Sequence, residues 1–381
     1  MPMKRRHAEI AGAGFAGLAA ATALCQRGWT ARVHEKAPEA RAFGAGIFIW
    51  DNGLRVLKVL GAYDAVLKGA FAAPAYETRS DGKLTSYEAI NGTNRYRLLT
   101  MSRQHLHDAM LKAALAAGVD LVTSSEAVGA TPEGELLLAG GKRLKADVVV
   151  GAEGVRSAVR DSLGIQQERY RCKDGIIRVL TDRGPLKGGQ WDHVIDMWCH
   201  SPRVLRILYT PSGEDLLYMA MMAPLADPQA SKVPVDPEPW VECFPDLEPV
   251  LRGLADRGRY DVYETTRLEC WHRGRVALVG DSAHAMPPTL AQGAGCAIMN
   301  ALALAVALDE GGSVEEVLPR WERRERPLTD HTQSRAKQIA DSRSLAGGMS
   351  WDDDGLRAAR HVPTGTPADD PAFRSAAGPS A

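Results

Sequence analysis

The sequence has only six cysteines, and none of them forms a Cys-x-x-Cys pair, which argues against a zinc site and against a disulfide framework. Positive and negative side chains are also nearly equal in number, with 46 Lys and Arg against 47 Asp and Glu. The net charge therefore produces no electrostatic field that would attract nucleic acid or an acidic membrane surface. No uninterrupted apolar run approaches the ~20 residues that span a bilayer. These absences predict a reduced, cytoplasmic protein that binds a small molecule and uses no metal, nucleic acid or membrane.

The first 25 residues resemble a secretion signal, because a basic start is followed by an apolar, alanine-rich run. Its removal would delete the nucleotide-binding motif described below, so we interpret this segment as part of the folded protein. The length of 381 residues predicts two lobes, or one large lobe with an insertion.

The order of predicted elements indicates a parallel sheet interrupted by an antiparallel one. Apolar strands are predicted at 8–11, 30–35, 147–151 and 275–280, and helices at 15–26, 53–60, 105–117 and 292–309. This alternation is typical of a Rossmann-like α/β fold with helical crossovers. Strand patterns separated by turns occur at 176–180, 194–198, 204–210 and 216–222, which predicts an inserted antiparallel sheet.

These patterns divide the chain into two domains and a tail. The dinucleotide-binding domain is predicted to be discontinuous, over 1–70, 98–168 and 270–345. The substrate-binding β-sheet domain is predicted over 71–97 and 169–269. Residues 346–381 are rich in Gly, Pro, Ala, Ser and Asp without apolar period, which predicts a flexible or surface-wrapped tail.

A glycine-rich motif follows the first predicted strand and opens the first helix. Gly12 permits a tight turn, Gly14 lets the backbone approach a pyrophosphate, and Gly17 lets the helix pack closely on the strand. Glu35, at the end of the next strand, is placed to accept hydrogen bonds from ribose hydroxyls. The motif alone does not separate FAD from NAD.

Two further motifs occur later in the chain. One begins at Asp147 and reads Asp-Val-Val-Val-Gly-Ala-Glu-Gly. The other begins at Gly280 and reads Gly-Asp-Ser-Ala-His, followed by Pro287-Pro288 and by a Gln-Gly-Ala-Gly sequence from Gln292. In this order and at these separations, the three motifs resemble the single-component flavoprotein monooxygenases of the para-hydroxybenzoate hydroxylase type. The resemblance covers about residues 7–340.

The resemblance implies FAD, bound noncovalently, and either NADH or NADPH as a transient co-substrate, since only one nucleotide fingerprint is present. In this family the aspartate matching Asp281 holds the ribityl chain, and the segment from Pro288 to Gly295 passes beside the flavin ring. Arg103 matches an arginine that reaches the pyrophosphate, with an exposed helix-start arginine as the alternative. The cofactor-binding residues that we therefore predict are Gly12, Gly14, Gly17, Glu35, Lys36, Arg41, Arg103, Asp281, Gly293, Ala294 and Gly295.

The chain departs from the family pattern at three positions. The family usually has Asp where this chain has Glu153, Asn where it has Gly295, and Asp where it has Asn300. The extra methylene of Glu153 leaves its contacts with a nicotinamide open.

Segments around Arg41, Asn52, Asp196 and Gln292 resemble the hydroxypyridine branch of the family. In that branch the positions matching Arg206, Tyr218 and Tyr76 line the substrate pocket. A hairpin with Thr210 opposite Leu216 would place Arg206 and Tyr218 on one sheet face.

We predict Arg206, Tyr218, Tyr76 and Pro288 as the catalytic residues. A buried arginine on an apolar strand needs an anion, and a substrate carboxylate would fit its planar fork. Two alternatives stay open for Arg206, namely a solvated outward position and pairing with a structural aspartate such as Asp196. Tyr218 and Tyr76 are equally well interpreted as core aromatics.

The resemblance implies that the enzyme uses O2 to hydroxylate, and to open the ring of, a hydroxypyridine carboxylate such as 2-methyl-3-hydroxypyridine-5-carboxylate. Simple hydroxylation of a hydroxypyridine or hydroxybenzoate is the first alternative. An FAD dehydrogenase or a redox-sensing flavoprotein is the alternative of another class. The sequence is compatible with a monomer or a homo-oligomer.

Overall fold

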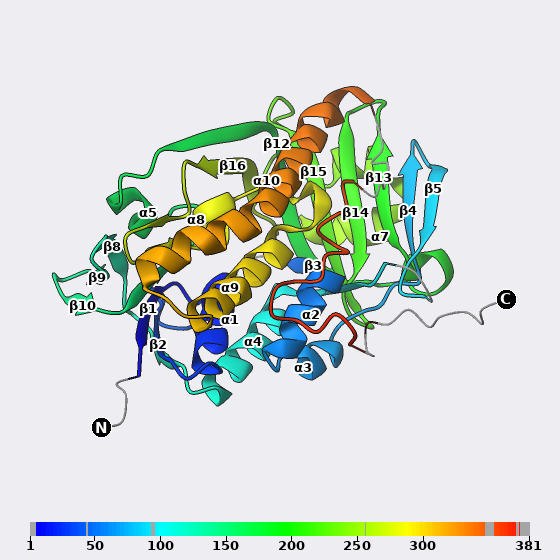
Figure 1. Ribbon diagram of the computed structural model, residues 1–381. Helices are drawn as coiled ribbons and strands as arrows, with labels where there is room; N and C mark the ends of the chain where they lie inside the picture. The colour runs from blue at the N-terminus through cyan, green and yellow to red at the C-terminus, as the bar shows by residue number, and fades with distance from the viewer. Residues whose placement is uncertain are drawn as a thin grey trace.

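The protein is seen here as a computed structural model that describes residues 5–42, 45–92, 96–255, 257–346, 354–370 and 373. A parallel sheet packed by long helices lies beside a larger, mostly antiparallel sheet (Figure 1). This arrangement confirms the predicted α/β fold class with an interrupting β-sheet layer.

The parallel sheet is formed by strands that are far apart in sequence. Its order is β17 (His272–Arg273), β18 (Val276–Leu278), β11 (Val148–Gly151), β1 (His7–Ala11), β2 (Thr30–His34) and β7 (Asp120–Val122). All neighbours are parallel except β17 and β18. Strands β1, β11 and β18 each lead into one of the three sequence motifs, so the sheet brings the motifs together at one edge.

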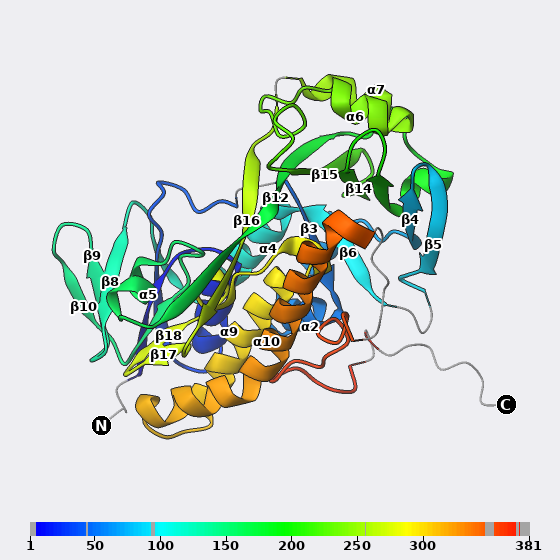
Figure 2. The same cartoon turned by 90° about the horizontal axis from the view of Figure 1, so that it is seen from above.

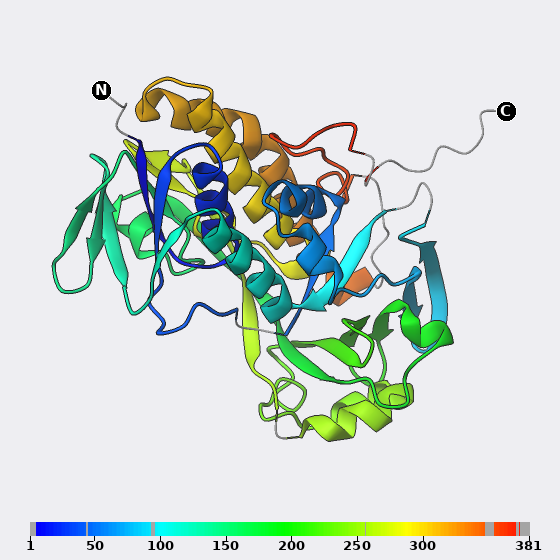
Figure 3. The same cartoon turned by 90° about the horizontal axis from the view of Figure 1, so that it is seen from below.

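Long helices pack together beside this sheet. They are α1 (Phe15–Cys25), α4 (Arg103–Ala116), α9 (Gly293–Asp309) and α10 (Val314–Ala346). Helix α1 contacts both α4 and α9, and α10 lies along α9 (Figure 3). Helix α4 begins two residues before the predicted start because the Ser102 side chain accepts a hydrogen bond from the His105 backbone N–H at 3.0 Å and caps the helix.

Shorter helices and 3₁₀ turns complete the chain. They are α2 (Asp51–Val59), α3 (Tyr63–Leu67), α5 (Ala158–Ser162), α6 (Glu238–Cys243), α7 (Glu248–Leu251), α8 (Asp281–His284), η1 (Gly189–Asp192), η2 (Pro245–Leu247), η3 (Arg252–Leu254) and η4 (Pro288–Leu290).

The larger sheet has seven strands from two parts of the chain. Its order is β16 (Tyr260–Leu268), β12 (Gln167–Asp182), β15 (Leu216–Pro224), β14 (Leu205–Pro211), β13 (Val194–Cys199), β4 (Ala75–Ser80) and β5 (Lys83–Ala89). The pairs are antiparallel except β13 with β4, which is parallel. The predicted boundaries of the two domains stay a prediction.

Each face of the seven-stranded sheet carries its own apolar cluster. One face, with Met197 and Met219, packs against α6 and α7, which lie on its outer side (Figure 2). The other face, with Tyr76 and Tyr218, packs against residues outside the sheet such as Trp50 and Leu98. The second face is therefore covered by the part of the molecule that carries the nucleotide motifs.

The β14–β15 hairpin has a register two residues away from the prediction. Thr210 lies opposite Tyr218, not Leu216, because Ser212 N–H bonds the Leu216 carbonyl at 2.8 Å and shortens the loop to three residues. A shift of two residues preserves the alternation of faces, so Arg206 and Tyr218 still share one face.

Two small sheets complete the described strands. Strands β3 (Gly46–Trp50) and β6 (Leu98–Ser102) pair with each other, and β8 (Ala127–Thr131), β9 (Glu135–Leu138) and β10 (Arg143–Lys145) form a three-stranded meander. Along β3, Ile47 and Ile49 enter the core of the parallel sheet, whereas Phe48 and Trp50 enter the substrate-side cluster. Strand β3 therefore couples the two cores.

The part of the C-terminal tail that the structure describes, 354–370, packs on the protein surface. It is tied to α2 by an ion pair between Lys58 and Asp370 at 2.6 Å, and to α10 by a hydrogen bond from Thr364 to Glu325 at 2.8 Å. Residues 347–353, 371, 372 and 374–381 lie outside the described residues. In the described part of the chain, no helix is both long enough and apolar enough to cross a bilayer.

One acidic residue is buried in the middle of the parallel sheet. Glu9 on β1 is 2% exposed and contacts His34 Nε2 at 2.7 Å and His7 Nε2 at 3.0 Å. Burial raises the pKa of Glu9, but the hydrogen bonds and charges of the two histidines outweigh that effect and hold the pKa at about 2.

This lowered pKa predicts a loss of stability in acid. Above pH 4.5, Glu9 is ionised in both the folded and the unfolded protein, and its contacts with the histidines stabilise the folded protein. This contribution is lost as the pH falls towards 2. We expect Glu9→Gln to be less stable than wild type at pH 6 by about 3 kcal/mol, and the gap to narrow by about 2 kcal/mol at pH 3. Urea unfolding at both pH values measures this difference in the free energy of unfolding. A gap that does not change with pH would show that Glu9 does not titrate in this way.

Candidate active site

The glycine-rich turn is held by close contacts between backbones. A Cβ on Gly17 would lie 2.0 Å from the Gly12 carbonyl oxygen, and a Cβ on Gly12 would lie 2.6 Å from the Ala152 oxygen, where φ is +97°. Gly14 differs, because a Cβ there would meet no protein atom within 4 Å and the residue is exposed. Two glycines therefore build the turn, and the third leaves the start of α1 open to a ligand.

Two acidic residues lie at this edge of the sheet. The Glu35 carboxylate accepts backbone hydrogen bonds from Ala13 at 3.1 Å and Ala37 at 2.9 Å, and a carboxylate has further acceptor sites for ribose hydroxyls. Asp281 begins α8, whose preceding Gly280 packs against Ala16 of α1. The Asp281 side chain is open to solvent on one side. Protein atoms around the carboxyl group remove part of its hydration and raise its pKa, whereas the charges of Arg103 and Arg178 lower it.

Positive charge lies next to these carboxylates. Arg103 lies at the start of α4, and its guanidinium lies 4.9 Å from the centre of the Phe15 ring, at the N-terminus of α1. Burial lowers its pKa, as does the nearby Arg178, whereas Asp281 raises it. An arginine beside a helix N-terminus suits a phosphate group.

The segment expected beside the flavin ring forms η4 and the start of α9. Gly293 and Ala294 lie in the first turn of α9. Gly295 packs against Asn52, because a Cβ added at Gly295 would lie 3.2 Å from the Asn52 side chain. The Asn52 amide donates to Gln292 Oε1 at 3.1 Å, which ties this segment to α2. Pro288 is exposed at its start.

Tyr218 and Tyr76 lie on the sheet face that meets this region. Tyr218 is 6% exposed, and its ring lies so close to Gly46 that a Cβ there would be 2.2 Å from it. Burial raises the pKa of Tyr218, whereas the charge and the hydrogen bond of Arg178 lower it. A raised pKa keeps the hydroxyl protonated at neutral pH, so that it can donate a hydrogen bond. Tyr76 is 5% exposed, and its hydroxyl donates to Asp196 at 3.3 Å.

Arg206 lies inside the protein and has a partner there. Its Nε and Nη2 atoms donate to the two Asp196 oxygens at 2.5 and 2.8 Å, and Asp196 is fully buried. Burial lowers the Arg206 pKa, but the charge of Asp196 and its hydrogen bonds raise it above its usual value. The alternative of a structural aspartate partner thus describes the observed geometry, and a solvated position does not.

Arg178 is a second arginine on the same face, and it was not predicted from the sequence. It lies opposite Ala220, two residues along β12 from the position opposite Tyr218. Its ion pair with Asp261 is long, 3.3 Å, and both side chains are about 30% exposed. The signal was present, since Arg178 interrupts an apolar predicted strand just as Arg206 does.

His107 is a second residue that was not predicted from the sequence. This buried side chain on α4 contacts the Ala13 carbonyl through Nε2 at 2.8 Å and fixes the glycine-rich turn from the other side. No local motif marks such a long-range contact.

The sequence also singled out Lys36, Arg41 and Glu153. Lys36 and Arg41 are exposed on the loop after β2, and Phe43 and Gly44 lie outside the described residues. Glu153 accepts hydrogen bonds from Ser157 Oγ at 2.8 Å and the Val159 N–H at 2.9 Å, so its carboxylate organises the start of α5.

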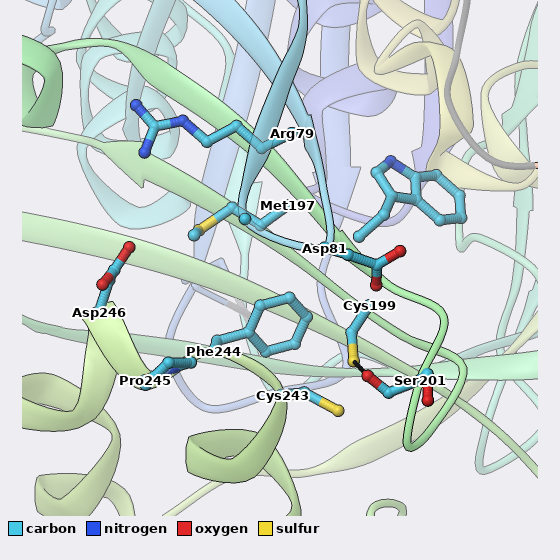
Figure 4. Close-up of a pocket in the computed structure, with 11 residues that line it drawn as sticks. Arg79, Asp81, Met197, Cys199, Ser201, Cys243, Phe244, Pro245 and Asp246 are labelled. Carbon is cyan, nitrogen blue, oxygen red and sulfur yellow. Dashed lines mark hydrogen bonds between the residues drawn. The ribbon is translucent and has the colours of Figure 1, made fainter.

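A pocket of about 340 Å³ lies elsewhere, on the outer side of the seven-stranded sheet (Figure 4). Met197 and Cys199 line it, and they belong to the face that packs against α6 and α7, opposite Tyr218. It is therefore separate from the predicted substrate face. Within the described ranges, no group of three or more His, Cys, Asp or Glu side chains is arranged to hold a metal ion.

Comparison with known proteins identifies the fold and its chemistry. Residues 6–336 match the family model described as an FAD binding domain. The chain belongs to this family. It is an FAD-dependent monooxygenase, and the open Gly14 backbone, Glu35 and Asp281 fit that cofactor.

Solved and curated relatives span nearly the whole enzyme. The tetrameric form of 2-methyl-3-hydroxypyridine-5-carboxylic acid oxygenase is 54% identical, with a TM-score of 0.91, over 94% of this chain and 97% of that one. A 2-heptyl-3-hydroxy-4(1H)-quinolone synthase of Mycobacteroides abscessus is 40% identical over 87% of this chain and 89% of its own. A 6-hydroxynicotinate 3-monooxygenase of Pseudomonas fluorescens is 28% identical over 80% and 83%.

The geometry of the turn predicts different effects for two alanine substitutions. Gly14→Ala should leave the apoprotein folded, because its Cβ meets no protein atom, but should weaken FAD binding by about ten-fold or more. Gly17→Ala is the contrasting variant and should destabilise the apoprotein itself, because its Cβ collides with Gly12. Thermal unfolding of the apoproteins and fluorescence titration with FAD separate the two effects. Wild-type FAD affinity in Gly14→Ala would mean that the pyrophosphate does not approach there.

Proposed function

We propose that the enzyme uses NADH or NADPH and O2 to hydroxylate, and then to open, the ring of a hydroxypyridine carboxylate similar to 2-methyl-3-hydroxypyridine-5-carboxylate. The observation that carries this proposal is the 54% identity, over nearly the full length, to an oxygenase named for that substrate. The bound flavin would take electrons from the nicotinamide and activate O2.

The chain's own residues would hold the cofactor at one edge of the parallel sheet. The start of α1 and Arg103 would bind the pyrophosphate, Glu35 the ribose, and Asp281 the ribityl chain. The N-terminus of α9 would stabilise negative charge beside the ring system.

The substrate ring would lie between the flavin and the face of the seven-stranded sheet. Tyr76 and Tyr218 would contact it there, in an apolar surrounding that keeps water away. The Arg206–Asp196 pair would position Tyr76, because Asp196 also accepts the Tyr76 hydrogen bond. Arg206 would then act through Tyr76 and not as the carboxylate anchor.

Arg178 is the better candidate for binding the substrate carboxylate. Both oxygens of Asp196 are bonded to Arg206, whereas Arg178 lies near Arg103 and Asp281 and has a partly exposed ion pair with Asp261 at 3.3 Å. Such a pair contributes little, so its loss would cost little when a substrate anion binds.

A second candidate function is hydroxylation of a 4-quinolone ring without ring opening. It is supported by the 40% identity to the quinolone synthase. A quinolone of that kind has no carboxylate, so the two candidates differ in whether an arginine is needed to bind the substrate.

The proposed function predicts oxygen consumption that depends on the ring substrate. We expect 2-methyl-3-hydroxypyridine-5-carboxylate to accelerate flavin reduction by NADH or NADPH in stopped-flow absorbance. Mass spectrometry of the product separates the two outcomes, because ring opening adds two oxygen and two hydrogen atoms to the substrate whereas simple hydroxylation adds one oxygen atom. With ¹⁸O2, at least one added oxygen is labelled in either case. Equal reduction rates with and without every ring tested, and no labelled product, would favour a dehydrogenase or a sensor.

The two arginines are expected to differ when each is replaced by methionine. Arg178→Met should weaken binding of the carboxylated ring by about ten-fold to a hundred-fold, because a hydrogen bond to a charged group contributes roughly 1.5–3 kcal/mol. Arg206→Met should mainly destabilise the fold, by about 3–5 kcal/mol, since it leaves Asp196 buried without its partner. Calorimetric titration and urea unfolding measure these effects. A stable Arg206→Met protein that has lost only carboxylate binding would return the anchor role to Arg206.

A further inference from the structure

The segment 354–360 lies against the predicted substrate site, although it comes from the tail of the chain. The Ala359 carbonyl accepts a hydrogen bond from the Asn52 backbone N–H at 3.3 Å, and the Asn52 side chain bonds Gln292. At its other end, Asp354 contacts His331 and Arg335 of α10, at 3.3 and 3.4 Å. The segment therefore crosses from α10 to the start of α2, next to the residues expected beside the flavin.

Neighbouring side chains of this segment enter different apolar clusters. Leu356 and Ala359 are 2% and 1% exposed and belong to the cluster that contains Tyr76 and Tyr218. Ala358, between them, belongs to the core of the parallel sheet. Two side chains of the segment therefore lie in the apolar cluster on the sheet face that carries Tyr76 and Tyr218.

The same cluster reaches the segment beside the flavin. Ala291, between η4 and α9, packs against it. Leu356 and Ala359 therefore pack in the same apolar cluster as the two tyrosines that would contact the ring. The cluster is apolar, so it suits an alkyl substituent of the ring and not its carboxylate.

We propose that Leu356 and Ala359 determine which ring substituents the enzyme accepts, by closing the substrate site against alkyl groups larger than methyl. This inference rests on the proposed function for the position of the ring, but not on the identity of the ring. Leu356 limits the length of the substituent, and the small side chain of Ala359 leaves room for methyl.

The test compares two ligands that differ only in the 2-alkyl group, 2-methyl- and 2-propyl-3-hydroxypyridine-5-carboxylate. Binding is measured by calorimetric titration of the FAD-loaded enzyme, without turnover. Leu356→Ala should lower the dissociation constant of the propyl ligand by about ten-fold relative to that of the methyl ligand, because burial of the two extra methylene groups contributes about that factor. Ala359→Val should shift the ratio in the opposite direction.

Two controls separate size selection from loss of folding. Val362→Ala shortens an exposed side chain two residues beyond the segment and should leave the ratio unchanged. Thermal unfolding of each variant shows whether it remains folded, and Ala359→Val provides a second measurement if Leu356→Ala unfolds. An unchanged ratio in both folded variants would overturn the inference.

The outcome is distinguishable from failure of the proposed function. If the wild type binds neither pyridine, the same variants are titrated with 2-methyl- and 2-heptyl-4(1H)-quinolone. A shifted ratio in that series supports the role of Leu356 and Ala359 and rejects the hydroxypyridine substrate. If the wild type binds no ring of either series, both proposals are overturned.

Discussion

The structure depends on how closely the backbone of α1 approaches its neighbours. Gly17 touches the Gly12 carbonyl, Gly12 touches Ala152 at the end of β11, and Gly280 touches Ala16. The three sequence motifs therefore meet at the first turn of one helix. A side chain at any of these contacts would separate strands that must converge if Glu35 and Asp281 are to hold the same cofactor. The glycine pattern is thus a packing requirement first, and the exposed backbone at Gly14 is its functional result.

Electrostatic balance decides which arginines are available to a ligand. A buried charge is tolerated when it is paired, and Asp196 fulfils that need for Arg206 inside the sheet. Arg178 lies on the same face, near Arg103 and Asp281, and its ion pair with Asp261 is 3.3 Å long and about 30% exposed. A partly exposed pair of that kind contributes little, so Arg178 is less tightly held by its partner than Arg206 is. The sheet face therefore carries one arginine that is fixed beside a tyrosine and another that we propose for binding the substrate.

Much of the fold could be predicted from the sequence because its local signals agree. The strands and helices around the glycine-rich turn and from Gln292 onward lie within a few residues of the predicted positions, since glycines and apolar runs mark them directly. The hairpin register was wrong by two residues, because turn residues do not define how far the pairing continues. The shared face of Arg206 and Tyr218 was nevertheless predicted correctly, since the alternation of side chains does not change with a shift of two.

What the sequence could not decide is which distant residues meet. It offered Asp196 only as one alternative for Arg206, and no local pattern marks His107 beneath the turn or the path of 354–360. The last of these bears on the choice between relatives named for a 2-methyl ring and for a 2-heptyl ring. The glycine-rich turn and Asp281 would serve the cofactor, which is the same for every ring, and so would not discriminate between rings. Discrimination requires side chains that contact the ring substituent, and the tail contributes Leu356 and Ala359 to the apolar cluster that holds Tyr76 and Tyr218. A segment without sequence period is therefore the place where we propose that substrate choice is made, while the motifs serve the cofactor.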